Sequence, residues 1–310
     1  MDSASSSTFA FTKTVSAALR NQRPVVALES TVITHGLPEP VNLELAQSME
    51  KIVSDGNATP ATIAVLGGQV HVGLEADELE NLSKSRSTHK ISARDFGPAA
   101  ARKWDGGTTV AATLIVSRNA GIRVFATGGI GGVHRGSNFD ISADLIELGR
   151  SPVVVVCAGA KSILDLPATL EFLETQGVPV VGYGVDEFPA FYSTSSGLRL
   201  ECRVDTPEEV ANVALAHWQT GLKSAVLVVN PPPPADAIPT QIVEAWITRA
   251  EKDAHLAGVH GNALTPYLLS RLSEISGNAT LKTNLALLRN NAELAAKIAC
   301  ALFPEKQQVI

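Results

Sequence analysis

Residues Arg123 to Lys161 read RVFATGGIGGVHRGSNFDISADLIELGRSPVVVVCAGAK, and this stretch decides the fold. Arg123–Thr127 and Pro152–Cys157 are short apolar runs of the kind that form strands covered on both faces. A glycine-rich loop and a helix-forming segment, Ser142–Leu148, lie between them. A strand, a helix and a second strand in this order indicate parallel strands with helices packed against the sheet.

The same alternation extends along most of the chain, so we expect an α/β fold. Hydrophobic periodicity and turn residues predict further strands at Pro24–Leu28, Thr62–Leu66, Gln69–Val72, His89–Ser92, Val178–Gly182, Leu198–Val204 and Ala225–Val229. They predict helices at Leu43–Val53, Glu75–Ser83, Thr108–Ala120, Pro167–Thr175 and Pro207–Gln219, and a loop at Thr31–Asn42. Beyond Pro234 the pattern is all helical, at Thr240–Asp253, Thr265–Ile275 and Lys282–Ala301.

The arrangement predicted from these elements is a three-layer α/β/α sandwich with a mainly parallel central sheet and C-terminal helices. We expect one domain over residues 1–310, with residues 1–10 as a flexible tail. That tail is rich in Ser and lacks the pattern of a secretory signal, which predicts a cytoplasmic protein.

Composition excludes several classes of protein. Of the 310 residues, 45% are hydrophobic and 18% charged, which is typical of a folded soluble chain and excludes intrinsic disorder. A net charge of -6 argues against a nucleic-acid polymer or an anionic membrane as partner. Three scattered cysteines are too few for a disulfide framework or a zinc ribbon.

Two candidate catalytic residues follow predicted strands. Glu29 comes where a buried strand enters a loop, and burial makes such a carboxylic acid a candidate proton donor; a carboxylate that caps a turn is the alternative. Lys161 lies beyond Pro152–Cys157, at the edge where parallel sheets bind ligands. A partly dry amine there can attack a carbonyl carbon, whereas a solvated surface lysine is the alternative.

The loop between them is a candidate ligand cradle. Five glycines between Thr127 and Asp140 allow backbone N–H groups to approach an anion, although the spacing is neither a dinucleotide fingerprint nor a Walker A loop. A structural turn is the alternative. Asp140 and Asp144 suit a hard cation such as Mg²⁺ or Mn²⁺, with helix capping as the alternative that can coexist.

Together these segments resemble the pseudouridine-5′-phosphate glycosidase family, which includes the indigoidine synthase A-like proteins. The resemblance runs from about Val25 to Ala301 and rests on the motifs ALEST (27–31), THG (34–36), GGIGGVHRG (128–136), FDISADL (139–145), CAGAK (157–161) and GYGVDEFPAFY (182–192).

The resemblance implies a role for each of several residues. Glu29 is implied as the proton donor, Lys161 as the covalent nucleophile and Asp140 as the ligand of Mn²⁺, with Mg²⁺ or another divalent cation as the alternative. Substrate contacts are implied for Lys90, Val110, His134, Ser142, Ala143, Asp144 and Asn284.

The implied reaction converts pseudouridine 5′-phosphate and water into uracil and ribose 5-phosphate through a lysine imine. The resemblance also implies a homotrimer. Two other functions remain open at this stage: an imine-forming aldolase acting on another phosphorylated sugar, and a non-catalytic binder of nucleotide phosphates.

Overall fold

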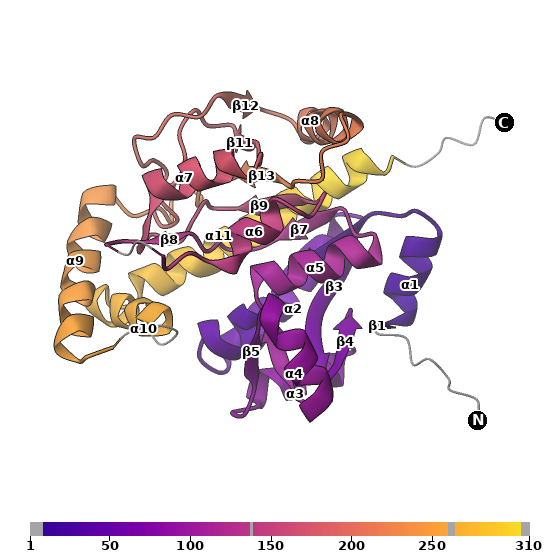
Figure 1. The fold of residues 1–310 in the computed structure, drawn as a ribbon, viewed down its shortest axis with the longest axis horizontal. Helices are drawn as coiled ribbons and strands as arrows, with labels where there is room; N and C mark the ends of the chain where they lie inside the picture. Colours follow the sequence, from indigo (N-terminus) through magenta and orange to yellow (C-terminus); the bar gives the residue numbers. More distant parts are fainter. Residues whose placement is uncertain (1–8, 137–138, 260–263, 305–310) are drawn as a thin grey trace.

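The computed structural model describes residues 9–136, 139–259 and 264–304, and Figure 1 shows them arranged around one large sheet. The six strands at its centre and one end are all parallel, in the order β2 (Val25–Leu28), β7 (Val124–Ala126), β9 (Val154–Cys157), β13 (Val226–Val229), β11 (Val180–Tyr183) and β12 (Cys202–Val204). Every residue of the first four is buried, because helices cover both faces of the sheet.

The other end of the sheet is mixed. It consists of β1 (Phe9–Phe11), β3 (Thr59–Leu66), β4 (Gln69–Val72), β5 (His89–Ile91) and β6 (Gly106–Thr108). The predicted strands Thr62–Leu66 and Gln69–Val72 are present in β3 and β4, which pair in antiparallel fashion on either side of Gly67 and Gly68 and form a hairpin. The first half of β3 pairs with β2 and its second half with β6, so β6 takes the place of β2 where β2 ends.

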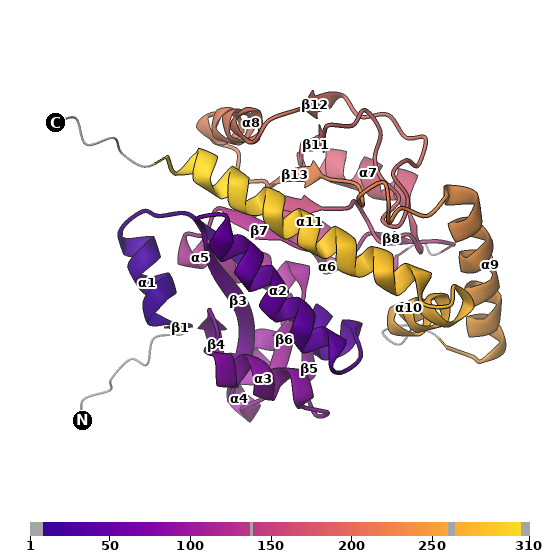
Figure 2. The same ribbon diagram turned by 180° about the vertical axis from the view of Figure 1, so that it is seen from behind.

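Helices form a layer on each face, as predicted. In Figure 1 the near face carries α5 (Val110–Ala120), α6 (Ala143–Leu148) and α7 (Leu166–Thr175). The opposite face, seen in Figure 2, carries α2 (Val41–Asp55), α8 (Pro207–Gln219) and α11 (Ala279–Leu302). The long helix α11 packs against α2, α8, β7 and β9, so it is part of the layer and not an appendage.

The remaining elements lie around this sandwich. They are the helices α1 (Lys13–Arg20), α3 (Ala76–Lys84), α4 (Phe96–Arg102), α9 (Thr240–Leu256) and α10 (Leu264–Ile275), the short helices η1 (Val32–Gly36) and η2 (Ala93–Asp95), and the two-stranded ribbon β8 (Val133–His134) with β10 (Leu164–Asp165). Helices α9 and α10 pack against each other at one end of the molecule (Figure 1). Within the described ranges, no helix is long and apolar enough to cross a membrane.

Several boundaries differ from the sequence prediction. The predicted loop Thr31–Asn42 contains one turn of π-helix, η1, because buried Ile33 packs against the helices that flank it. The predicted helix Thr108–Ala120 begins at Val110, since Gly106–Thr108 pairs with β3 and β5 as β6. Of the predicted strand Leu198–Val204, only Cys202–Val204 pairs with β11.

The prediction of a flexible tail is wrong for Phe9 and Ala10. These two residues belong to β1, which pairs with β4 in parallel, and the Phe9 ring packs against the main core. The rest of the predicted tail, residues 1–8, lies outside the described residues.

Candidate active site

The ends of three neighbouring parallel strands meet at one edge of the sheet. Glu29 follows β2, Thr127 follows β7 and Lys161 comes four residues after the end of β9. Ligand sites of parallel sheets lie at this edge, because here the loops diverge and leave a crevice. The strand order therefore brings Glu29 and Lys161 together, although 131 residues separate them in the chain.

Glu29 is half-buried and accepts a hydrogen bond from the Thr127 hydroxyl at Oε1. Burial raises the pKa of the Glu29 carboxyl above its ordinary value, and this effect outweighs those of the Lys161 ammonium, the Thr127 hydroxyl and Lys90, which lower it. The nearby Asp144 carboxylate adds to the rise. A carboxyl group with a raised pKa is suited to general acid catalysis.

Hydrogen bonds to β3 hold the backbone beside Glu29, at the point where the partner strand of β3 changes from β2 to β6. Ser30 is fully buried, and its hydroxyl donates to the Ile63 carbonyl and accepts from the Thr108 N–H at 2.9 Å. The Thr108 hydroxyl donates to the same Ile63 carbonyl at 2.7 Å. These bonds join the ends of β2 and β6 to the middle of β3 directly beside Glu29, which lines the cavity described below.

Lys161 is held by backbone pairing with the glycine loop. Its N–H donates to the Ile130 carbonyl at 3.1 Å, and the Ile130 N–H donates to Gly159 at 3.1 Å. Gly159 has a φ of +87°, and a side chain there would lie 2.5 Å from the Pro189 carbonyl oxygen, so only glycine fits. Ile130 thus pairs through both its N–H and its carbonyl with the segment that carries the lysine.

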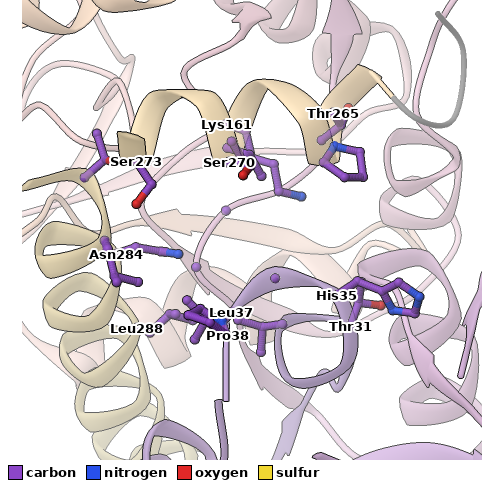
Figure 3. Close-up of a pocket in the computed structure, with 18 of the residues that line it drawn as sticks. Thr31, His35, Leu37, Pro38, Lys161, Thr265, Ser270, Ser273, Asn284 and Leu288 are labelled. Carbon is purple, nitrogen blue, oxygen red and sulfur yellow. The ribbon is translucent and has the colours of Figure 1, made fainter. Parts of the chain in front are cut away.

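A cavity of about 490 Å³ opens above these strand ends (Figure 3). Four of the residues predicted from the sequence line it: Glu29, Lys90, Lys161 and Asn284. Lys90 enters from β5, and burial of its amine together with the neighbouring Lys161 ammonium lowers the pKa of Lys90. Two amines that approach each other and a carboxyl group produce a positive region suited to an anionic ligand.

The sequence analysis missed most of the outer wall of the cavity. This wall comes from η1 and the residues after it, and from α10, whose side chains face the cavity in Figure 3. The residues concerned are Thr31, His35, Leu37, Pro38, Thr265, Ser270 and Ser273. The THG motif was a signal for His35, whereas nothing in the periodicity of α10 distinguishes Ser270 from a solvent-facing serine.

His35 stands at the rim of this wall. Its Nδ1 lies 2.7 Å from the Thr34 hydroxyl, and the side chain is exposed. Partial burial of the ring and the Lys90 ammonium lower the pKa of His35, so the imidazole is mostly neutral at pH 7. A neutral imidazole can both donate and accept a hydrogen bond.

A second group of predicted residues lies behind the glycine loop and not in the cavity wall. Asp144 is buried and its carboxylate accepts from two backbone N–H groups at 2.8 Å each, those of Ala111 and Gly131. Ser142 caps α6 by accepting from the Asp144 N–H at 3.2 Å. Val110 is buried at the start of α5, and Ala143 is exposed at the start of α6. Their predicted contacts with a substrate remain predictions.

His134 and Asp140 lie farther along the same loop. The His134 N–H donates to the Asp140 carbonyl at 3.0 Å, and His134 pairs with Leu164 in the small ribbon. The Asp140 side chain is exposed. Across the described part of the chain, no three His, Cys, Asp or Glu side chains gather closely enough to form a metal cage. A single exposed carboxylate fits only a cation that keeps most of its own water ligands, so the metal ligand stays a prediction.

Comparison with known proteins identifies the family. Residues 14–301 match the family model described as indigoidine synthase A like protein. The chain belongs to this family. The match confirms the resemblance found in the sequence motifs, because it covers all of them.

Among the curated proteins, this indigoidine synthase A-like chain is similar to pseudouridine-5′-phosphate glycosidases. The one from Herpetosiphon aurantiacus is 56% identical over 93% of this chain and 96% of its own length. The one from Deinococcus radiodurans is 54% identical over 92% of each chain.

Two solved structures of relatives have the same fold. An indigoidine synthase A-like protein from Thermotoga maritima aligns with a TM-score of 0.86 at 37% identity, over 94% of this chain and 95% of its own. The prealnumycin C-glycosynthase AlnA, in complex with ribulose 5-phosphate, aligns with a TM-score of 0.88 at 40% identity, over 95% of this chain and 96% of its own.

Proposed function

We propose that this enzyme cleaves the C–C glycosidic bond of pseudouridine 5′-phosphate with water, giving uracil and ribose 5-phosphate. The observation that carries the proposal is the placement of Glu29, whose carboxyl pKa is raised by burial, and the Lys161 amine in the wall of one cavity. The names of the curated relatives support this reaction. They give no support to an aldolase on another sugar or to a non-catalytic binder.

The bond to be broken explains why a lysine is useful. A carbon of uracil leaves far less readily than the oxygen of an ordinary glycoside, for which a pair of carboxyl groups suffices. An amine bonded to the anomeric carbon offers another route, because its lone pair can push out the carbon leaving group and form an imine.

In the proposed mechanism, Glu29 protonates the ring oxygen of the ribose while the Lys161 amine attacks C1′. The C1′–O4′ bond breaks and the sugar opens as an amine adduct. The nitrogen lone pair then forms a C1′=N bond as the C1′–C5 bond breaks and uracil takes a proton at C5. Water hydrolyses the imine, which frees ribose 5-phosphate and restores the Lys161 amine.

Other residues are proposed to bind and orient the substrate. Lys90 supplies positive charge for the phosphate in a chain of net charge -6, and Asn284 contacts the substrate from α11. The same role is proposed for Val110, His134 and the residues that begin α6, Ser142, Ala143 and Asp144. AlnA supports a pentose phosphate as ligand, since that relative holds ribulose 5-phosphate.

The cation, the assembly and the cell compartment are part of the same proposal. Asp140 would hold Mn²⁺, or another divalent cation, which would supply positive charge near the anionic substrate. The chain would act as a homotrimer in the cytoplasm.

The direct test is incubation of the purified chain with pseudouridine 5′-phosphate, with free uracil measured by chromatography. Uracil and ribose 5-phosphate are expected in equal amounts. Uridine 5′-phosphate, in which nitrogen carries the sugar, is the matched control for the C–C bond. A chain that leaves pseudouridine 5′-phosphate intact, with Mn²⁺ present, does not have the proposed function.

A further inference from the structure

Thr127 has all of its polar groups engaged at the end of β7. The residue is fully buried, and its N–H donates to the Val156 carbonyl of β9 at 3.0 Å. Its carbonyl accepts from Asn291 Nδ2 at 2.8 Å, and its hydroxyl donates to Glu29 Oε1. Backbone and side chain are therefore fixed by three different elements, which leaves the hydroxyl little freedom to turn away from Glu29.

A chain of buried amides extends this arrangement across the sheet. Asn291, on α11, accepts at Oδ1 from Asn230 Nδ2 at 3.0 Å. Asn230 follows β13, and its N–H donates to the Cys157 carbonyl at the end of β9 at 2.8 Å. Asn291 is fully buried and Asn230 nearly so. These bonds tie the ends of β7, β9 and β13 to α11, and a buried polar network with all its members paired keeps one geometry.

The direction of the Thr127 hydrogen bond decides where a proton on Glu29 can reside. Within the described residues, Glu29 Oε1 is the single acceptor for the Thr127 hydroxyl, and no protein group donates to Oε2. If the proton of Glu29 sat on Oε1, two hydrogens would compete for one contact. When Glu29 is protonated and Oε1 accepts from Thr127, the proton therefore sits on Oε2, the oxygen that remains for a ligand in the cavity.

We infer that Thr127 is a positioning residue for Glu29, which directs the acidic proton towards the ring oxygen of the substrate, while Asn291 and Asn230 hold Thr127 in place. This inference rests on the proposed glycosidase function. Thr127 does not line the cavity itself, so it acts through Glu29.

The chain contains a matched pair that serves as a control. Thr62, on β3, is also buried, and its hydroxyl donates to Glu50 Oε1 at 2.5 Å. Burial raises the pKa of the Glu50 carboxyl, as it does for Glu29. Neither Thr62 nor Glu50 lines the cavity. Loss of either hydroxyl should have a similar cost in stability, but only the loss at Thr127 should affect catalysis.

The test measures kcat against pH for the parent, Thr127→Val, Thr127→Ser and Thr62→Val, with thermal unfolding of each. Thr127→Val is expected to lower kcat by about tenfold or more, since the proton is no longer directed. The Thr127 hydroxyl lowers the pKa of Glu29, so its loss should also move the alkaline limb of the profile of kcat against pH to higher pH. Lys161, Lys90 and Asp144, which also face Glu29, are unchanged in every variant.

Thr127→Ser keeps the hydroxyl donor. It is expected to have most of the parental kcat and an alkaline limb at the same pH as that of the parent. Thr62→Val is expected to have parental kcat and an unmoved limb. The inference is overturned if Thr127→Val keeps kcat within about twofold of the parent, or if Thr127→Ser loses as much as Thr127→Val.

A second measurement separates this inference from the proposed function. The titration of Glu29 can be followed by infrared difference spectra against Glu29→Gln, without any substrate. The Glu29 carboxyl of Thr127→Val should titrate at higher pH than that of the parent. If the parent releases no uracil, the proposed function fails, and the titration still decides the inference: an unchanged Glu29 overturns it.

Discussion

The floor and the outer wall of the cavity are built in different ways. The floor consists of Glu29 and Lys161, which follow buried parallel strands. Hydrogen bonds hold both, since the Thr127 hydroxyl donates to Glu29 and the Lys161 N–H donates to the Ile130 carbonyl. The outer wall consists of η1 and α10, where His35 and Ser270 are exposed. Groups that must react within a few tenths of an ångström stand on rigid elements, and groups that contact the rest of a ligand stand on surface helices.

The largest effect should come from the floor, at Lys161. Lys161→Ala removes the nucleophile, so uracil release should fall to background while the fold is kept, because the side chain is only half-buried. Borohydride added during turnover should trap one pentose phosphate on the Lys161 peptide of the parent, seen by mass spectrometry. Normal uracil release by Lys161→Ala would show that no covalent adduct is needed; an adduct formed without uracil would favour an aldolase.

Chelation tests a third region, the loop edge that carries Asp140. If Asp140 alone holds a hydrated cation, the cation should be weakly bound and removable by a chelator, with loss of most activity. Mn²⁺ should restore the parent but not Asp140→Ala, and the uracil assay measures both. Full activity after thorough chelation would exclude the cation from the mechanism.

Glu29→Gln should slow uracil release about a hundredfold or more, the usual scale of general acid catalysis.

The variant should also change stability. Because the pKa of Glu29 is raised in the folded state, the folded protein keeps a proton that the unfolded chain loses above pH 4.5. The free energy of unfolding therefore falls as the pH rises from 4.5 to the pKa of Glu29 in the folded state. Glu29→Gln removes that decline.

Urea unfolding of the parent and Glu29→Gln at pH 5 and pH 8 measures this difference. The variant should lose less stability than the parent between the two pH values, and other groups, Glu50 among them, cancel in the comparison. An equal loss in both proteins would mean that Glu29 is not buried enough to retain a proton.

Lys90 also lines the cavity, and its removal should affect binding more than chemistry. Lys90→Ala should raise KM for pseudouridine 5′-phosphate about ten- to a hundredfold, the size of a lost hydrogen bond to a charged group, with a smaller change in kcat. Lys51→Ala is the control, since Lys51 is exposed on α2 and does not line the cavity. A fall in kcat with an unchanged KM would indicate that Lys90 takes part in the reaction itself.

The smallest effect is expected on the wall. Ser270→Ala should change KM by no more than a few-fold and leave kcat unchanged, because a neutral, exposed hydroxyl contributes little. Thr248→Ala, exposed on α9 outside the cavity, is the matched control. A kcat effect as large as that of Glu29→Gln would contradict the division between floor and wall.

The same division explains what the sequence could predict. Continuous apolar runs identify buried strands, so the ends of β2 and β9, and with them Glu29 and Lys161, were predictable. Strand order then follows from long-range pairing, which no local pattern encodes: Gly106–Thr108 has no hydrophobic signal and becomes a strand only because β3 offers it a free edge. Thr127 went unnoticed for a similar reason, since its partner Asn291 lies 164 residues away.

The helix α11 has a consequence for the order in which the site is made. It is synthesised after every strand of the sheet, yet it supplies Asn284 to the cavity and Asn291 to the Thr127 carbonyl. A chain still emerging from the ribosome would therefore have Glu29 and Lys161 translated long before the helix that completes their surroundings. The sheet alone brings the two reactive residues together, but the cavity gains Asn284 and the Thr127 carbonyl gains its partner only when the last helix docks.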